Sequence, residues 1–363
     1  MREAPATAMP TLTEADALKA VADGALKADA GGCDLSDDIR RLASSGILAR
    51  LCTFEGHPRE AKAQATVLRR IGRASLSVGR LAEGHMNALK LVTLYGTPDQ
   101  VRRHTTSARN GAIYGVWGAD ADPPVSVVTD LDGRLRLAGG KRFTSGLGTV
   151  SHAVVTAKHP DGLRLAIAEV GHPGRADAAA WDTCGMRATA SGSYDFNGVT
   201  AEALGAADDY LREPHFQGGV WRYAAVQTGG LEALAEEVRR AVSATDAPGE
   251  AQLHRLARIA SLAHRARLMV EDAAARVEAP GAGPEAVALS LAAREEVEVA
   301  CLEGLALADR ALGTRSFVKG QRAELVRRDL GFFLRQADLD GKLRQVGAAL
   351  CAAKAPIGEV WAG

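Results

Sequence analysis

The chain has 363 residues, of which 47% are apolar and 24% charged, as in soluble globular proteins long enough for more than one domain. Lysine plus arginine total 44 and aspartate plus glutamate total 44, a balance that argues against a general nucleic-acid binder. The sequence contains no run of about 18 apolar residues, so we predict no membrane-spanning helix. The N-terminal segment lacks the basic end and apolar core of a signal peptide.

The five cysteines are scattered and form no Cys-x-x-Cys pair. This pattern is typical of reduced, buried thiols and favours a cytoplasmic location. The histidines show no spacing typical of a metal site, so we expect no bound metal.

The first third of the chain has the sequence pattern of helices. Amphipathic spacing predicts helices over residues 34–48 and 60–81, continuing over 83–96. Gly96-Thr97-Pro98 predicts a break, and Asp99 begins a further short helix. We therefore predict an N-terminal helical domain over residues 1–111.

The pattern changes near Gly111 to short apolar segments, such as residues 112–117, 135–138, 153–157 and 163–170. Turn pairs such as Asp132-Gly133 and Asp161-Gly162 separate them. Short strands closed by such turns predict a β-sandwich or barrel domain over residues 112–205.

Long helical patterns return after Gly205. Apolar residues recur at three-to-four spacing over residues 221–242, 253–277, 285–312 and 325–350. Runs of this length predict a C-terminal four-helix bundle over residues 206–363. Residues 213–219, at the entry to the bundle, form either a ligand mouth or a rigid connector. The predicted fold class is thus α+β and mostly helical, with a β domain between two helical domains.

This order of domains resembles the acyl-CoA dehydrogenase superfamily, and five local stretches resemble its motifs. They are residues 95–100, 140–146, 184–191, 196–199 and 324–329. The resemblance extends from about residue 35 to residue 350. It implies FAD, or FMN as in some flavin-dependent monooxygenases of the same fold, bound between the β domain and the bundle.

The resemblance also implies a set of cofactor-binding residues. It places Trp117 and Phe143 against the flavin ring, and Thr144 or Ser145 within hydrogen-bond distance of it. Trp117 is alternatively a core residue of the β domain.

Three further positions follow from the same resemblance. Arg328 and Asp329 orient the bundle around the flavin, or form an ordinary ion pair between helices. Gly313 belongs to the segment on the adenine side of the cofactor.

Dehydrogenases of the superfamily use a glutamate to remove the proton α to a thioester. One usual position holds Trp221, just before Arg222, and the other lies about two helical turns after Arg328-Asp329. The second region holds Gln336, where the monooxygenases have a histidine, and Asp338, which fits only with a shift of one residue. Gln336 donates a hydrogen bond but transfers no proton. Asp338 is either the base or a solvated aspartate on the helix surface.

Three functions stay open at this point. We expect a flavin-dependent oxidoreductase of the acyl-CoA dehydrogenase type, acting on an acyl thioester without the usual glutamate. The alternatives are a flavin-dependent monooxygenase acting on another small organic substrate, and a non-catalytic scaffold or subunit. The resemblance also implies a homodimer or homotetramer, possibly with a homologous subunit, and neither nucleic acid nor membrane as a partner.

Overall fold

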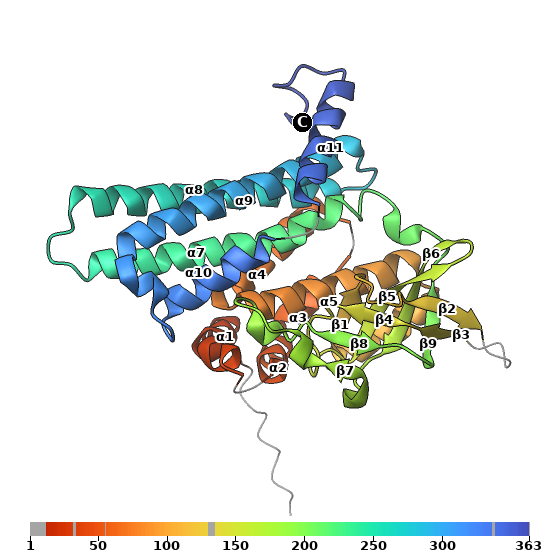
Figure 1. Ribbon diagram of the computed structural model, residues 1–363. Coiled ribbons are helices and arrows are strands. Elements are labelled where there is room, and N and C mark those ends of the chain that lie inside the picture. Colours follow the sequence, from red (N-terminus) through yellow and green to blue (C-terminus); the bar gives the residue numbers. More distant parts are fainter. Residues whose placement is uncertain (1–11, 32–33, 55, 130–134, 336–337, 363) are drawn as a thin grey trace, which may run out of the picture.

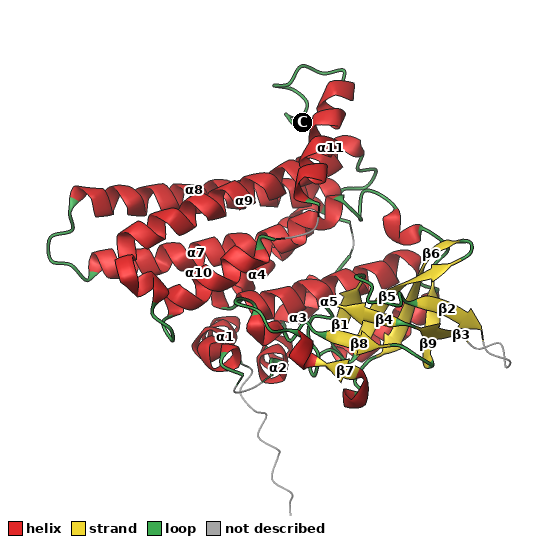
Figure 2. Cartoon of the chain, viewed as in Figure 1, coloured by secondary structure: helices red, strands yellow, loops and turns green. Residues whose placement is uncertain are grey.

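The computed structural model describes residues 12–31, 34–54, 56–129, 135–335 and 338–362. Along this described chain, helices come first, nine short strands follow, and long helices end the chain (Figure 1). Figure 2 shows the strands gathered at one side, with the C-terminal helices extending away from them. The predicted α+β, mostly helical fold with a middle β domain is confirmed. None of the described helices is both long and apolar enough to cross a membrane.

The N-terminal helices are α1 (Glu14–Asp29), α2 (Ser36–Ser44), α3 (Ile47–Leu51), α4 (Pro58–Ala74), α5 (Leu76–Tyr95) and α6 (Pro98–Arg109). A capping box between Thr97 and Gln100 starts α6 at the break that the sequence predicted. The predicted single run over residues 60–81 is wrong, because Ser75 has an extended backbone and separates α4 from α5. The Ser75 hydroxyl accepts the Val78 N–H at 3.3 Å, so this residue ends one helix and caps the next.

The larger sheet of the β domain closes on itself. Its strands are β1 (Tyr114–Trp117), β2 (Ser126–Thr129), β3 (Leu135–Ala138), β5 (His152–His159), β6 (Gly162–Glu169) and β9 (Val199–Leu204). Because β5 pairs with both β2 and β6, the strands β5-β2-β3-β9-β6 form a ring, and β1 pairs with β5 outside it. A second, small sheet contains β4 (Gly140–Arg142), β8 (Ser193–Asp195) and β7 (Ala176–Asp177) in the order β4-β8-β7.

Three of the four predicted bundle helices are present as α7 (Trp221–Ser243), α8 (Glu250–Val277) and α9 (Pro284–Leu312). They pack on one another, and α7 also packs against α4. At that crossing, Cβ atoms added to Gly72 and Gly229 would lie 2.2 and 2.1 Å from carbonyl oxygens of the facing helix. Glycine at both positions therefore lets the two backbones touch.

The predicted fourth run over residues 325–350 is not one helix. It is divided into α10 (Arg322–Phe333) and α11 (Leu339–Ala352). Asp338 has a φ of 56°, a left-handed conformation that does not continue a helix. Figure 1 shows α11 turned away from the line of α10. Val346 of α11 instead joins a small apolar cluster with Val287 and Leu291 of α9.

Candidate functional site

A cavity of about 400 Å³ lies between the β domain, the first turns of α5 and the end of α10. Its size is within the range of small-molecule sites. The described residues that line it are Arg80, Phe143, Ser145, Trp181, Met186, Thr189, Ser191, Phe332, Phe333 and Arg335. Two of these, Phe143 and Ser145, were predicted to contact the cofactor.

Three aromatic rings form one side of this cavity. The Trp181 ring meets Phe143 at a centroid distance of 6.1 Å and Phe332 at 5.5 Å, both edge to face. The Trp181 ring N–H donates to the Met186 carbonyl at 2.9 Å, which fixes the orientation of the indole. Phe143 is 54% exposed, so much of its ring is free to contact a ligand. This wall suits a flat aromatic ligand.

The backbone around the cavity is strained. Phe143, Met186 and Ala190 have φ values of 56°, 56° and 41°, and they account for three of the five non-glycine residues with positive φ in the described chain. Side chains disfavour this conformation, so it persists only where the surroundings impose it. Such strain gathers at functional sites, which supports the cavity as the site.

A chain of hydroxyl groups leads into the cavity. Thr189 and Ser191 lie 2.7 Å apart, and Ser191 donates to the Ser145 hydroxyl at 2.9 Å. The Ser145 hydroxyl oxygen therefore acts as an acceptor, and no described residue accepts the hydroxyl hydrogen of Ser145. That hydrogen is available to a ligand. Thr144 differs, because its buried hydroxyl donates to the Gly192 carbonyl at 3.0 Å and holds β4 near β8.

Arg328 and Asp329 brace the wall of the cavity from behind. The Asp329 carboxylate accepts the Met186 N–H at 2.7 Å. The Arg328 guanidinium donates to the Cys184 carbonyl at 3.1 Å and to the Asp29 carboxylate at 3.0 and 2.8 Å. The pair thus holds the strained loop and α1 against α10, and neither residue is among those that line the cavity.

The electrostatics of this brace are unusual for a carboxylate. Burial raises the pKa of Asp329 to about 7, although the Met186 N–H and the charge of Arg328 both lower it.

The other predicted site residues lie elsewhere. Trp117 is 1% exposed in the β core, and its ring N–H donates to the Ser145 carbonyl at 3.2 Å, so it supports the cavity only indirectly. Gly313 caps α9 and is not among the residues that line the cavity. Asp338 is exposed and follows the end of α10, so the two-turn spacing on one helix does not apply to it. Gln336 lies outside the described residues.

The sequence reading missed Arg80, Trp181 and Phe332. Phe332 lies three residues after Asp329 on the same helix face, so helical spacing from Asp329 could have identified it as a site residue. Trp181 stands in an irregular segment, where no periodicity marks a residue as facing a site.

A second cavity of about 400 Å³ adjoins the first, because Arg80 and Phe333 line both. Residues of α5, the end of β1 and the segment 210–223 form its walls. His215, Phe216 and Gly219 lie in the distinctive segment at the entry to the bundle, and all three line this cavity. Each of the two neighbouring cavities is large enough for a small molecule.

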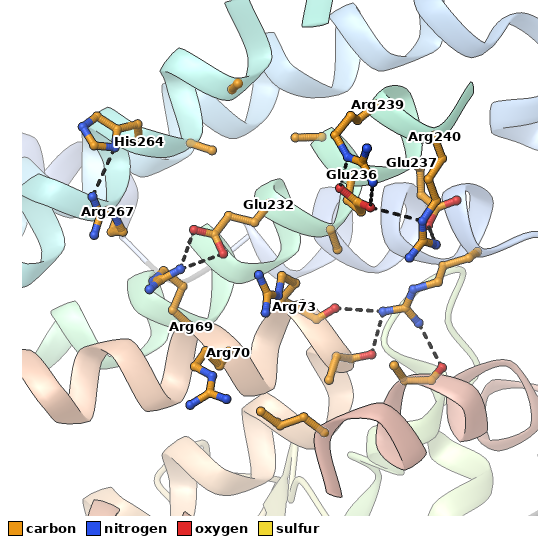
Figure 3. A pocket seen from close by; sticks show the side chains of 18 of the residues that line it. Arg69, Arg70, Arg73, Glu232, Glu236, Glu237, Arg239, Arg240, His264 and Arg267 are labelled. Atoms are coloured by element: carbon orange, nitrogen blue, oxygen red, sulfur yellow. Dashed lines mark hydrogen bonds and ion pairs between the residues drawn. The ribbon is translucent and has the colours of Figure 1, made fainter. Parts of the chain in front are cut away.

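A larger groove of about 790 Å³ lies between α1, α4, α7 and α8. Figure 3 shows that its many charged side chains face one another: Arg69 pairs with Glu232 at 2.6 Å, and Arg239 with Glu236 at 2.7 Å. The groove has neither the strained loop nor the aromatic wall of the first cavity. We therefore do not assign it as the site. No group of three or more metal-binding side chains occurs among the described residues.

Neither a family model nor a curated protein matches the sequence significantly, whereas many solved structures match the fold. Butyryl-CoA dehydrogenase from Megasphaera elsdenii is 16% identical, with a TM-score of 0.80 over 96% of this chain and 100% of that one. KijD3, solved with FMN and a dTDP-linked amino-keto sugar, is 18% identical, with a TM-score of 0.79 over 99% and 98%.

A third structure is the TdsC protein of Paenibacillus sp. A11-2, a dibenzothiophene monooxygenase that was solved with FMN and indole. It is 20% identical, with a TM-score of 0.76 over 94% of this chain and 96% of that one. The resemblance predicted from the sequence is thus confirmed at the level of the fold, which this chain shares with a dehydrogenase and with flavin monooxygenases.

Proposed function

We propose that this chain is a flavin-dependent monooxygenase that binds FMN or FAD in the cavity beside Phe143. The fold is shared by an FMN-bound monooxygenase, by FMN-bound KijD3 and by a dehydrogenase, which supports a flavin-dependent oxidoreductase in general. The chemistry of the two neighbouring cavities then favours oxygenation over dehydrogenation.

The cavity residues fit a flavin. The rings of Phe143, Trp181 and Phe332 would pack against the flat ring system, and the Ser145 hydroxyl would donate a hydrogen bond to it. Reduced flavin, when bound, supplies the electrons that activate molecular oxygen. The protein's part is to hold the ring, exclude water from it and orient the substrate.

The single observation that carries the choice of reaction is the absence of a suitably placed base among the described residues. Neither Asp nor Glu lines the cavity beside Phe143. At one family position, Trp221 is fully buried and its ring N–H donates to Glu278 at 3.3 Å. At the other, α10 ends at Phe333 and Asp338 is exposed. Monooxygenation does not require removal of an α-proton, so this layout suits it.

One feature favours dehydrogenation as a second candidate. Glu83 is 3% exposed and lines the second cavity, where a base would meet a substrate. Both of its carboxylate oxygens, however, are taken up by Arg80 and Asn87. A carboxylate held as an acceptor in this way is a weaker candidate for proton removal.

The test combines a spectrum with oxygen consumption. The purified chain is titrated with FMN and with FAD, and we expect visible flavin absorption at near-stoichiometric occupancy. Trp181→Ala is expected to weaken flavin binding at least tenfold, whereas the exposed variant Lys19→Met leaves it unchanged. Consumption of oxygen with a flavin reductase and substrate supports oxygenation. Bleaching of the flavin by an acyl-CoA without oxygen favours the dehydrogenase instead, and a chain that stays colourless favours the non-catalytic scaffold.

We further propose assembly into a homodimer or homotetramer through the bundle. The exposed sides of α8 and α9 carry large apolar residues that are 45–50% exposed, namely Leu253, Leu268, Val299 and Leu302. Light scattering of the purified chain tests this, and a monomer at micromolar concentration contradicts it.

A further inference from the structure

The second cavity, which adjoins the proposed flavin cavity, has four charged side chains in its wall. Arg80, Glu83, Lys90 and Arg222 line it, and Glu278 contacts the last two. Buried charges are costly unless they are paired. The pairing of these five groups therefore indicates what kind of molecule the cavity accepts.

Glu278 is shared by two cations. The Lys90 ammonium lies 2.9 Å from one carboxylate oxygen, and the Arg222 guanidinium contacts the other. The side chains of Lys90, Glu278 and Arg222 are only 8%, 6% and 4% exposed. Burial opposes ionisation of Glu278, but the charges of Arg222 and Lys90 outweigh it and lower its pKa to about 2. Two cations and one anion leave one buried positive charge in excess.

The remaining groups do not compensate this charge. Arg80 and Glu83 form a pair of opposite charges and cancel. His215 lies close enough to feel Glu278, Lys90 and Arg222, and burial lowers the pKa of its ring, so it is neutral at pH 7. The described lining of the cavity together with Glu278 thus carries one uncompensated positive charge.

Unpaired hydrogen-bonding atoms lie beside this charge. The Arg222 Nε, the His215 Nδ1 and the Asn87 Oδ1 are buried and have no hydrogen-bond partner among the described residues. Arg222 also lies so close to Gly219 that a Cβ there would come within 2.6 Å of its guanidinium. A fixed guanidinium with an unused N–H donor is the group that proteins use to bind carboxylates.

We propose that this cavity holds the substrate, and that the substrate is a small organic molecule with one negative charge, a carboxylate bound by Arg222 and Lys90. This inference rests on the proposed function, because the shared residues Arg80 and Phe333 place the cavity beside the flavin cavity. A neutral acyl chain would leave the excess charge unmatched and the Arg222 donor unused. A monoanion satisfies both.

The test compares carboxylates with their neutral amides, which have nearly the same shape. Isothermal titration of the whole chain uses benzoate against benzamide and acetate against acetamide. In the unmodified chain we expect at least one carboxylate to bind at least tenfold more tightly than its amide. Lys90→Met leaves Arg222 and Glu278 as a neutral pair. The affinities for a carboxylate and its amide are then expected to differ by no more than about threefold, with amide binding retained. Glu278→Gln removes the carboxylate that pairs with Lys90 and Arg222 and is expected to raise the ratio of carboxylate to amide affinity.

The opposite signs of these two changes separate a charge effect from loss of folding, which would weaken both ligands in both variants. Lys19→Met, which removes an exposed lysine on α1, is the matched control and is expected to keep the original ratio. Equal binding of carboxylates and amides, or no binding of any carboxylate, overturns the proposal. The titrations are run without flavin, with FMN and with FAD. Failure of both flavins to bind overturns the proposed function, while a carboxylate preference in the flavin-free chain still stands.

Discussion

Replacement of Gly229 by alanine is expected to force α4 and α7 apart. A Cβ at this position would lie 2.1 Å from the Arg69 carbonyl oxygen and 2.6 Å from the Arg73 backbone nitrogen. Both are backbone atoms of α4, so no side chain can rotate away to relieve the contact. The helices must therefore separate by about 1 Å to restore ordinary contact, in a region packed as densely as an organic crystal.

Two effects of opposite sign set the magnitude. Overpacking of a helix contact costs about 1–3 kcal/mol. Alanine is a better helix former than glycine by about 1 kcal/mol, which offsets part of that loss. We expect Gly229→Ala to lower the free energy of unfolding by up to about 2 kcal/mol. Since α7 carries Arg222 and α4 leads through Ser75 into α5 with Arg80, the second cavity should also become wider.

Urea denaturation followed by helical circular dichroism measures this effect. Gly331→Ala is the matched control, because Gly331 lies within α10 and a Cβ there would meet only Leu305 Cδ1, at 4.0 Å. The control is expected to be as stable as the original chain or up to about 1 kcal/mol more stable. Equal stability of Gly229→Ala and Gly331→Ala would refute the reasoning that the α4–α7 crossing depends on backbone contact.

Three further outcomes are expected. The folded chain keeps a proton on Asp329 up to about pH 7, whereas the unfolded chain releases it near pH 4. The free energy of unfolding therefore falls as pH rises through this window, by at most about 1.4 kcal/mol per pH unit. Asp329→Asn should flatten that slope in pH-dependent urea titrations, and an unchanged slope would contradict the raised pKa of Asp329. Phe143→Gly should weaken flavin binding in a fluorescence titration. It should also raise the thermal midpoint of the flavin-free chain, because glycine adopts a φ of 56° without strain. A lowered midpoint would show that the contacts of the Phe143 ring contribute more to stability than the backbone strain costs. Gly185→Ala places a Cβ 2.6 Å from the Arg328 carbonyl oxygen and 2.7 Å from the Phe332 Cβ, so flavin affinity should drop at least tenfold. Gly171→Ala is the control and should leave flavin affinity unchanged, because a Cβ there meets no atom within 4 Å.

The fold was largely predictable because its signals are local and repeated. Long apolar periodicity marks α7, α8 and α9, and Gly96-Thr97-Pro98 marks both a stop and a capped start. The errors have local causes as well. Ser75 is one residue of extended backbone inside a periodic pattern, and Asp338 interrupts a pattern whose apolar spacing runs on into α11. A single backbone conformation of this kind leaves no trace in periodicity.

The candidate site was less predictable, because its residues depend on partners far away in the sequence. Phe143 and Ser145 line the cavity, but the neighbouring Thr144 turns inward to Gly192. Arg328 faces Asp29 of α1, a helix that the sequence analysis did not predict, since its buried face consists mainly of alanines. Its role as a brace could not be derived without that partner.

The ring formed by β5-β2-β3-β9-β6 has a consequence for the solubility of the chain. An open sheet ends in two strands whose free N–H and C=O groups can pair with another molecule and seed aggregation. Closure removes both of these ends. The strand outside the ring, β1, pairs with β5 and is packed against α5. The larger sheet can therefore accept changes in its exposed loops, and with them new ligands, and the free strand edges of the β domain are confined to the short strands β1, β4 and β7.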